Sequence, residues 1–300
     1  MRTTFLVLGS ALLLVVAGAA AGKTSTVTIT KNGYVPRSLS VTAGDTVAFT
    51  NSDSVAHQIV FKSTTGVTCT PNPLVVQPTQ SGSCVFASAG SFSYSDPNIH
   101  GNTFKGSITV AAPPDAVTMT ATPAILLFGA KVAGSGTVST QKAGETVDVF
   151  AQQCGQNAAQ KAATVQTATG GAYTFSLQPL ANTTYTTKLR NATSPATTVR
   201  VRPRVVLLRV AAHRYSLRAY AGESFAGKYA GFQRYNGTTR RWVAVKLIQL
   251  KAGTGTAAPT VASAASFRAT VKAGVRIRAV LSQAQVGTCY APGTSNTIRA

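Results

Sequence analysis

Residues 38–61 read SLSVTAGDTVAFTNSDSVAHQIVF, and this stretch decides the fold class. Apolar residues two positions apart recur in it, at Leu39/Val41, Val47/Phe49 and Ile59/Phe61. Because side chains alternate between the two faces of a β-strand, each pair marks a strand that buries one face. The Gly44-Asp45 pair between the first two runs is typical of a turn. We therefore expect short, half-buried strands here.

The same period of two continues on both sides of this stretch. Further pairs occur at Val27/Ile29, Phe92/Tyr94 and Ile108/Val110, and Gly, Pro, Asn, Asp and Ser separate the runs. The sequence after residue 22 contains no convincing long amphipathic helix. Many short strands at this spacing are typical of β-sandwiches, so the sequence predicts an all-β protein.

Three sandwich domains are expected in the 300 residues. The first covers residues 23–111, and the proline-containing segment 112–116 is a linker, because proline cannot donate to a β-ladder and stiffens the chain. Residues 117–202 and 203–300 meet near Pro203 and are of similar size. We expect each of them to be an immunoglobulin-like β-sandwich.

The first 22 residues have the order of a secretory signal peptide. Arg2 precedes an apolar stretch at residues 5–16, and small residues follow at 17–21. The apolar stretch is too short to read comfortably as a spanning helix, and no later stretch is apolar for long enough to cross a bilayer. We expect a protein that is secreted or held at the cell surface, with no transmembrane segment once the signal is removed.

The four cysteines fit an oxidising compartment, where disulfides persist. Cys69 and Cys84 enclose a short stretch that contains Pro and Gly, so we expect these two to be bonded. Cys154 and Cys289 remain, one in each of the two later domains, and pair by elimination.

Basic residues are concentrated toward the C-terminus. Residues 23–112 carry five Lys/Arg and three Asp, whereas residues 203–300 carry fifteen Lys/Arg and one acid, Glu223, a net charge of +14. Such a segment indicates polyanionic surroundings, for example an anionic cell-envelope polymer, and the alternative is a merely solvated sheet face. No nucleic-acid-binding motif occurs, so we expect no nucleic-acid partner.

Two runs in the first domain carry a family resemblance. The opening run is Tyr34-x-Pro36, Leu39-x-Val41, Gly44-Asp45-x-Val47-x-Phe49-x-Asn51-x-Asp53 and His57, and the closing run is Gly90-x-Phe92-x-Tyr94, His100 and Phe104-Lys105-Gly106-x-Ile108-x-Val110. With these runs, residues 24–111 resemble the cupredoxins, the small copper proteins of the plastocyanin and amicyanin type. The resemblance implies a Greek-key β-sandwich with a copper site at one end.

The resemblance also implies which residues stand at the copper-ligand positions. In that family the first ligand is a His at the place of His57, and the closing run carries Cys, His and Met ligands in that order. His100 matches the second His, Asp96 stands where the Cys belongs, and Phe104 stands where the Met belongs. A blue type 1 copper site needs a thiolate, so any copper held here is expected to be of another type.

Strand parity permits a metal at this place. Tyr94 and Asp96 share one strand face, and His57 is directed inward by the same argument. Two imidazoles and a carboxylate suit Cu(II), Zn(II) or, less well, Fe. The expected metal ligands are His57, His100 and Asp96, and the residues expected to surround them are Phe104, Tyr94 and Asn51.

Two functions are consistent with these observations. In the first, the protein binds copper or another divalent metal through its His pair and carries or buffers it outside the cell, with electron transfer less favoured. In the second, it is a metal-free surface or adhesive protein in which the two histidines only hydrogen-bond to loop carbonyls. No nucleophile elbow, zinc-protease motif or phosphate-cradling loop occurs, so we do not expect an enzyme.

Overall fold

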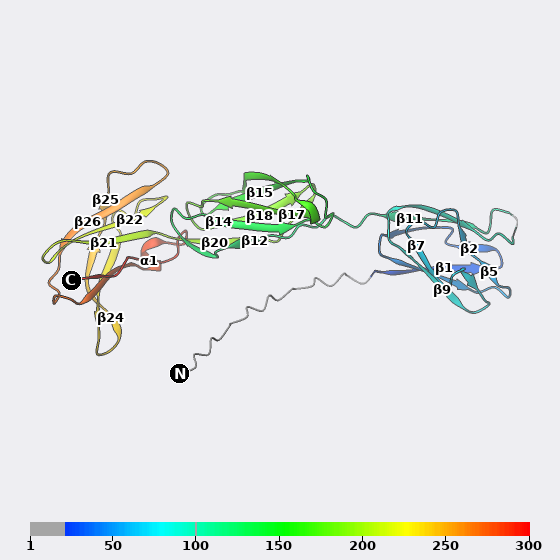
Figure 1. Ribbon diagram of the computed structural model, residues 1–300, viewed down its shortest axis with the longest axis horizontal. Helices are drawn as coiled ribbons and strands as arrows, with labels where there is room; N and C mark the ends of the chain where they lie inside the picture. Colours follow the sequence, from blue (N-terminus) through cyan, green and yellow to red (C-terminus); the bar gives the residue numbers. More distant parts are fainter. Residues whose placement is uncertain (1–21, 100) are drawn as a thin grey trace, which may run out of the picture. The chain divides into compact units, whose positions relative to one another are not determined.

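The computed structural model describes residues 22–99 and 101–300, and nearly all of its regular structure is β-strand (Figure 1). The all-β prediction is thereby confirmed. The expected signal peptide and His100 lie outside the described residues, apart from Gly22. The described chain divides into two compact units at residues 113 and 114. None of its helices has the length and apolar character needed to cross a bilayer.

The first unit contains two sheets and a short two-stranded ladder. In spatial order, the first sheet comprises β2 (Gly33–Val35), β1 (Thr24–Thr30), β4 (Thr46–Asn51), β9 (Ser81–Phe86) and β7 (Val67–Thr70). The second sheet comprises β3 (Ser38–Thr42), β11 (Lys105–Ala111), β10 (Gly90–Ser95) and β6 (Val60–Phe61). The ladder pairs β5 (His57–Gln58) with β8 (Val75–Val76). Both sheets are mixed, because β1 runs parallel to β4 and β3 runs parallel to β11.

Alternating side chains fill the core of this unit. Val27, Ile29, Val47 and Phe49 are each 0% exposed, and the residues between them on β1 and β4 are only partly buried. Phe49 also contacts the ring of Tyr94 edge-on, with ring centroids 5.3 Å apart. The alternate apolar residues of β1 and β4 are therefore buried in the core, as the period of two in the sequence predicts.

The turn between β3 and β4 depends on Gly44 and Asp45. Gly44 has φ +96°, a conformation that strongly favours glycine. The Asp45 carboxylate accepts hydrogen bonds of 2.8 Å from the backbone N–H groups of Thr42 and Lys23. These two bonds, that of Thr42 first, lower the pKa of Asp45. The turn thus ties the residue before β1 to the connection between β3 and β4.

The second unit contains four sheets, which fall into two groups along the chain. The sheets before residue 203 comprise β12 (Thr120–Thr122), β14 (Val132–Thr137) and β17 (Ala172–Leu177), and then β13 (Ile125–Leu127), β20 (Thr197–Arg202), β18 (Thr183–Leu189), β15 (Thr146–Gln153) and β16 (Gln160–Gln166), with β19 (Ala192–Thr193) beside β18. A 3-10 turn, η1 (Thr169–Gly171), precedes β17.

The sheets after residue 203 face each other across the core of the last sandwich. One comprises β21 (Arg204–Ala211), β22 (Arg214–Ala221), β26 (Val261–Arg268) and β25 (Lys251–Ala252). The other comprises β24 (Arg241–Gln249), β23 (Tyr229–Asn236), β27 (Arg276–Leu281) and β28 (Gly293–Thr294), with β29 (Ile298–Arg299) beside β27. The short helix α1 (Gln283–Val286) follows β27.

Both expected disulfides are present. Cys69 and Cys84 are direct partners on the neighbouring strands β7 and β9, with Cα atoms 4.0 Å apart. Cys154 and Cys289 are bonded across 135 residues and join the two sandwiches of the second unit. All four cysteines of the chain are therefore used.

Hydrogen bonds accompany the second disulfide. The Tyr290 hydroxyl donates to the Leu180 carbonyl over 2.8 Å, and the Asn182 side chain donates to the Thr288 carbonyl over 2.9 Å. Tyr290 is 1% exposed and belongs to a hydrophobic cluster with members from both sandwiches. The segment after α1 thus holds the last sandwich against the preceding one.

We predict that the variant Cys154→Ser/Cys289→Ser loses about 2–5 kcal/mol of unfolding free energy in the second unit, because the bridge closes a long loop in the unfolded chain. Trp242, the single tryptophan, lies in this unit and reports its unfolding by guanidinium titration. The variant Cys69→Ser/Cys84→Ser is the control and should leave the Trp242 transition in place. An unchanged midpoint in the first variant would show that the noncovalent contacts alone hold the two sandwiches.

Candidate functional site

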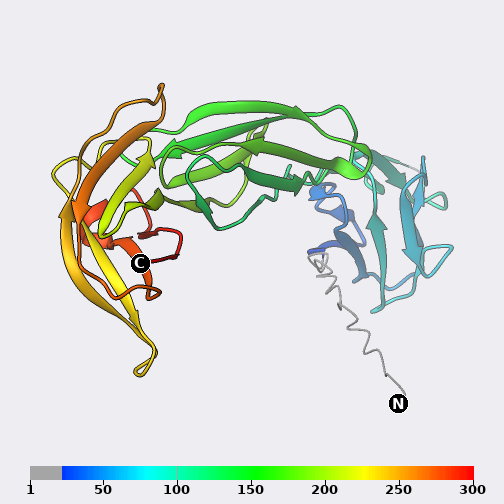
Figure 2. The same ribbon diagram turned by 60° about the vertical axis from the view of Figure 1, so that its left-hand side comes forward.

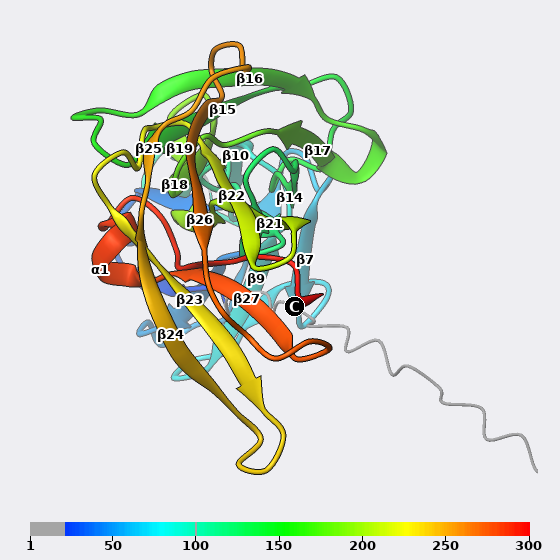
Figure 3. The ribbon, with the colours of Figure 1, turned by 90° about the vertical axis from the view of Figure 1, so that its left-hand side faces the viewer.

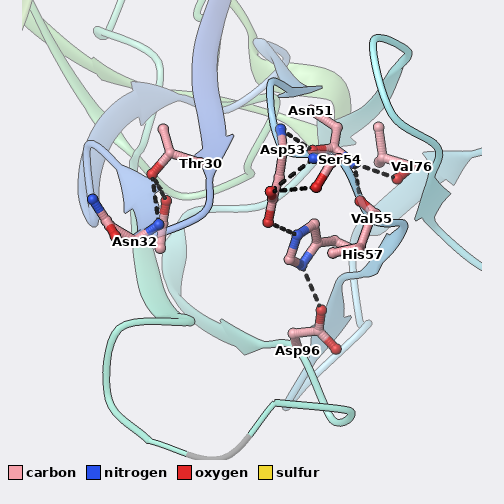
Figure 4. Close-up of polar contacts among 10 residues, drawn as sticks. Thr30, Asn32, Asn51, Asp53, Ser54, Val55, His57, Val76 and Asp96 are labelled. Atoms are coloured by element: carbon pink, nitrogen blue, oxygen red, sulfur yellow. Dashed lines mark hydrogen bonds and ion pairs between the residues drawn. The ribbon is translucent and has the colours of Figure 1, made fainter.

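Strand ends bring several of the predicted site residues together in the first unit (Figure 4). His57 begins β5, Asp96 directly follows β10, and Phe104 directly precedes β11. Asp53 lies in the turn that follows β4. The backbone N–H of Asp96 donates to the Phe104 carbonyl over 3.1 Å, which ties the two ends of the loop between β10 and β11.

The imidazole of His57 is completely enclosed, with 0% exposure. Its Nδ1 lies 2.9 Å from Asp96 Oδ2, and its Nε2 lies 3.1 Å from Asp53 Oδ2. A ring protonated at both nitrogens donates to both carboxylates, whereas a neutral ring donates to one. The Phe104 ring stacks on the imidazole at a centroid distance of 4.9 Å and an angle of 12°. Carboxylates therefore occupy both edges of the ring and an aromatic side chain covers one face.

Asn51 organises the turn that carries Asp53 and His57. Its side-chain amide donates to the carbonyls of Val55 over 2.7 Å and Val76 over 2.9 Å, and its Oδ1 accepts from the Asp53 backbone N–H over 2.8 Å. Asn51 is 1% exposed, so these bonds satisfy a buried amide. The predicted position of Asn51 near the site is thus explained by backbone hydrogen bonds.

Asp96 uses both of its oxygens. Oδ2 faces His57, and Oδ1 accepts from the Asn98 backbone N–H over 2.9 Å. The Asp96 side chain is 1% exposed and lies close enough to Tyr34 to influence it. Burial first, and then the Asp96 charge, raises the pKa of the Tyr34 hydroxyl. These two contacts give the buried carboxylate the partners it needs, and they hold the start of the loop between β10 and β11 in place.

An aromatic cluster lies beside this network, around Phe104. The Tyr34 ring meets Tyr94 and Phe104 edge-on, with centroids 5.0 and 5.6 Å away. Within residues 22–99 and 101–300 the hydroxyls of Tyr34 and Tyr94 are buried and have no hydrogen-bond partner. Burial raises the pKa of Tyr94 to about 12. The predicted role of Tyr94 next to the site is therefore one of packing.

The described residues do not fit a metal centre. No cysteine is free to supply a thiolate, and both imidazole nitrogens of His57 already have carboxylate partners at hydrogen-bond distance. Over the described ranges, no group of three or more His, Cys, Asp and Glu side chains is arranged to hold a metal ion. His57 and Asp96 lie together as expected ligands would, but the third expected ligand, His100, falls outside the described residues. A type 1 copper site is therefore not built by these side chains.

Asp53 is the member of this network that sequence reasoning missed. It precedes His57 by four residues and was visible only as part of the Asn51-x-Asp53 motif. The backbone N–H of Ser54, and then His57, lower the pKa of the Asp53 carboxyl through hydrogen bonds. Folding therefore stabilises the ionised form of Asp53.

A separate groove of the first unit lies away from His57. A groove of about 800 Å³ is formed on the sheet β3-β11-β10-β6, and Arg37, Lys62 and Lys105 are among its lining residues. Neither His57 nor Asp96 lines this groove. The His57 network is thus enclosed by protein and does not form the wall of this groove.

Comparisons with known proteins concern only part of the chain. No protein-family profile and no curated protein matches it. Among solved structures it is similar to an oxidized mutant of amicyanin, with 26% identity and a TM-score of 0.24 over 31% of this chain and 84% of that one. It is also similar to amicyanin from Paracoccus versutus, with 22% identity and a TM-score of 0.23 over 31% of this chain and 86% of that one. These neighbours are cupredoxins, but at such TM-scores the likeness carries no inference about the site.

We predict that Asp96→Ala destabilises the first unit by about 1.5–3 kcal/mol, because it removes a charged acceptor from the buried His57 ring and from the Asn98 N–H. Circular dichroism during urea unfolding at pH 7 measures this loss. Asp53→Ala is the comparison, since its carboxylate is more exposed, at 13%, and we expect a smaller loss. Because folding lowers the pKa of Asp53, its contribution is present above about pH 4 and is lost as the pH falls through the folded value. Equal losses from the two variants at pH 7 would contradict the central position of Asp96.

Proposed function

We propose that this chain is a secreted binding protein that attaches to an anionic polymer of the cell envelope through residues 203–300, and that it is not an enzyme. One observation carries this proposal. Of the fifteen Lys/Arg in this segment, none forms an ion pair within the described residues, and the segment's single acid is Glu223.

The uncompensated charge has a physical consequence. Like charges on one small sandwich repel each other and destabilise the compact state, and a polyanion that neutralises them relieves this repulsion. By contrast, the Lys and Arg side chains that form salt bridges in the described part of the chain all lie at or before residue 190, such as Lys161 with Asp148 and Arg190 with Glu145. The charge of the last sandwich is therefore available to a partner.

In this proposal the first unit is a sandwich that presents a surface and does not hold a metal. The enclosed His57 network supports this reading, since its polar groups already satisfy one another. Arg37, Lys62 and Lys105 help to line the groove of this unit. This groove is a cationic surface in addition to that of residues 203–300. The two disulfides fit a protein that works outside the cell.

Metal carriage is the second candidate function, because His57 and Asp96 meet in a buried site beside Phe104. To bind Cu(II) or Zn(II), His57 would have to release one carboxylate, and a further donor such as His100 would have to complete the set. Carriage or buffering of copper or another divalent metal would then be the function, with electron transfer less favoured in the absence of a thiolate.

We predict that the secreted chain is retained on immobilised poly(glycerol phosphate) and elutes as the salt concentration rises, since screening weakens exposed charge contacts. The variant Arg218→Gln/Arg241→Gln/Arg276→Gln/Arg299→Gln should elute at clearly lower salt. The matched control removes four cations from the first unit, Lys23→Gln/Lys31→Gln/Lys62→Gln/Lys105→Gln. Equal shifts in both variants would show that retention follows total charge and not the last sandwich.

A second measurement decides between the two functions. We expect Cu(II) titration of the secreted chain, followed by electron paramagnetic resonance, to give the same affinity for the wild type and for folded His57→Ala and His100→Ala variants. A resonance signal from Cu(II) bound with high affinity, lost in both variants, would establish the metal-binding function instead. Such a signal should lack the blue absorption band, because all four cysteines are in disulfides.

A further inference from the structure

Two arginines and two aromatic side chains form an ordered group on the last sandwich. We call Tyr235, Trp242, Arg276 and Arg278 the arginine–aromatic face; they lie on β23, β24 and β27, which are neighbours in one sheet (Figure 3). Tyr235 and Trp242 are direct cross-strand partners. The hairpin of β23 and β24, yellow in Figures 2 and 3, extends beyond the body of its sandwich. Residues 237–241 at its tip and Arg276 are exposed.

Each arginine of this face lies over an aromatic ring. The Arg276 guanidinium is 4.0 Å from the Tyr235 ring centroid, and the Arg278 guanidinium is 4.2 Å from the Trp242 ring centroid. The two rings themselves are 5.4 Å apart and meet edge-on. The ring holds the planar guanidinium in one position before a ligand binds. Less side-chain entropy is therefore lost on binding.

The stacked arginines keep donors free. The Arg278 Nε donates to Gln233 Oε1 over 2.8 Å, which leaves both of its Nη atoms without a protein acceptor in the described chain. Arg276 has no acceptor for its guanidinium among the described residues. Because a ring lies over one face of each guanidinium, the N–H groups, which lie in the guanidinium plane, stay free to donate to a ligand.

A third arginine stands beside this face. Arg299 on β29 is the direct cross-strand partner of Arg276, and like charges in that relation destabilise a sheet. Arg276 and Arg278 are two residues apart on β27, about 6.7 Å at the usual rise of a strand. The three arginines therefore form a small cluster of positive charge, two along β27 and one across from Arg276, in which one anion can accept from two neighbouring arginines.

We propose that the arginine–aromatic face binds a polymer whose units are joined by phosphodiester groups, with Arg276, Arg278 and Arg299 bonding to its phosphates. This inference rests on the proposed function and names the site and the anion for it. Arginine is the residue of choice for phosphate recognition, because its fixed fork of N–H donors bonds to the phosphate oxygens bidentately. Neighbouring guanidiniums on β27 and β29 thus fit a polymer that repeats its phosphates along the chain.

The test uses the secreted chain and its single tryptophan. Poly(glycerol phosphate), polygalacturonate and phosphatidylglycerol vesicles are titrated in turn, while Trp242 emission and calorimetry report binding. We expect the tightest binding and a change in Trp242 emission with poly(glycerol phosphate). We expect Arg276→Gln/Arg278→Gln to raise its Kd at least about tenfold, and to reduce the slope of log K against log salt by about 2.

Two further variants separate this site from charge alone. Arg214→Gln/Arg268→Gln removes an exposed cross-strand arginine pair from the other sheet and should change the Kd by less than about threefold. Trp242→Leu keeps the net charge and should still weaken binding, measured by calorimetry, because Arg278 loses its support. The site would be overturned by an equal loss of affinity in the two arginine-pair variants or by a preference for polygalacturonate or vesicles. Binding without a change in Trp242 emission would also overturn it. Absence of binding to all three anions at low salt would instead overturn the proposed function.

Discussion

A β-strand in a sandwich can bury only one of its two faces, and this constraint places all of the polar chemistry in this protein. Aliphatic and aromatic side chains take the inner face of the first unit, so its polar groups gather where strands end: Asn51 closes β4, His57 opens β5 and Asp96 follows β10. In residues 203–300 the outward faces and the turns are the places left for fifteen cations. One enclosed network and one exposed charged face result from the same rule.

The His57 network and the arginines of residues 203–300 differ in whether their polar groups have hydrogen-bond partners in the protein. A buried imidazole is costly unless its nitrogens have partners, and His57 has a carboxylate at each one. Where the family resemblance places a thiolate, this chain has Asp96, which holds His57 and the Asn98 N–H and so closes the loop instead of leaving a coordination position open. Arg276 presents the opposite case, an ordered cation with no protein acceptor in the described chain.

Much of this arrangement could be read from the sequence, and the rest depends on contacts that sequence periodicity does not contain. Parity along β10 directs Asp96 inward with Tyr94, the short stretch between Cys69 and Cys84 predicts one disulfide, and elimination gives the other. The contact of Asp53 with His57 arises from a turn held by Asn51, so no strand period encodes it. The stacking of Arg278 on Trp242 requires the register of three strands and a bulge opposite Phe232/Gln233, where Val245 is the extra residue and changes the parity along β24. Such a bulge is a property of the paired strands and not of either sequence alone.

The Cys154–Cys289 bridge also determines how this molecule carries mechanical load. If the protein is tethered through Arg276 and pulled from its N-terminal side, tension enters on β27, follows the backbone to Cys289 and crosses the sulfur–sulfur bond to Cys154. The strands between residues 155 and 275 then lie outside the covalent load path, and the noncovalent boundary between the two sandwiches is not the weakest element in series. A protein tethered in this way would carry the load through its covalent chain from β27 to Cys154, and not through the contacts between the two sandwiches.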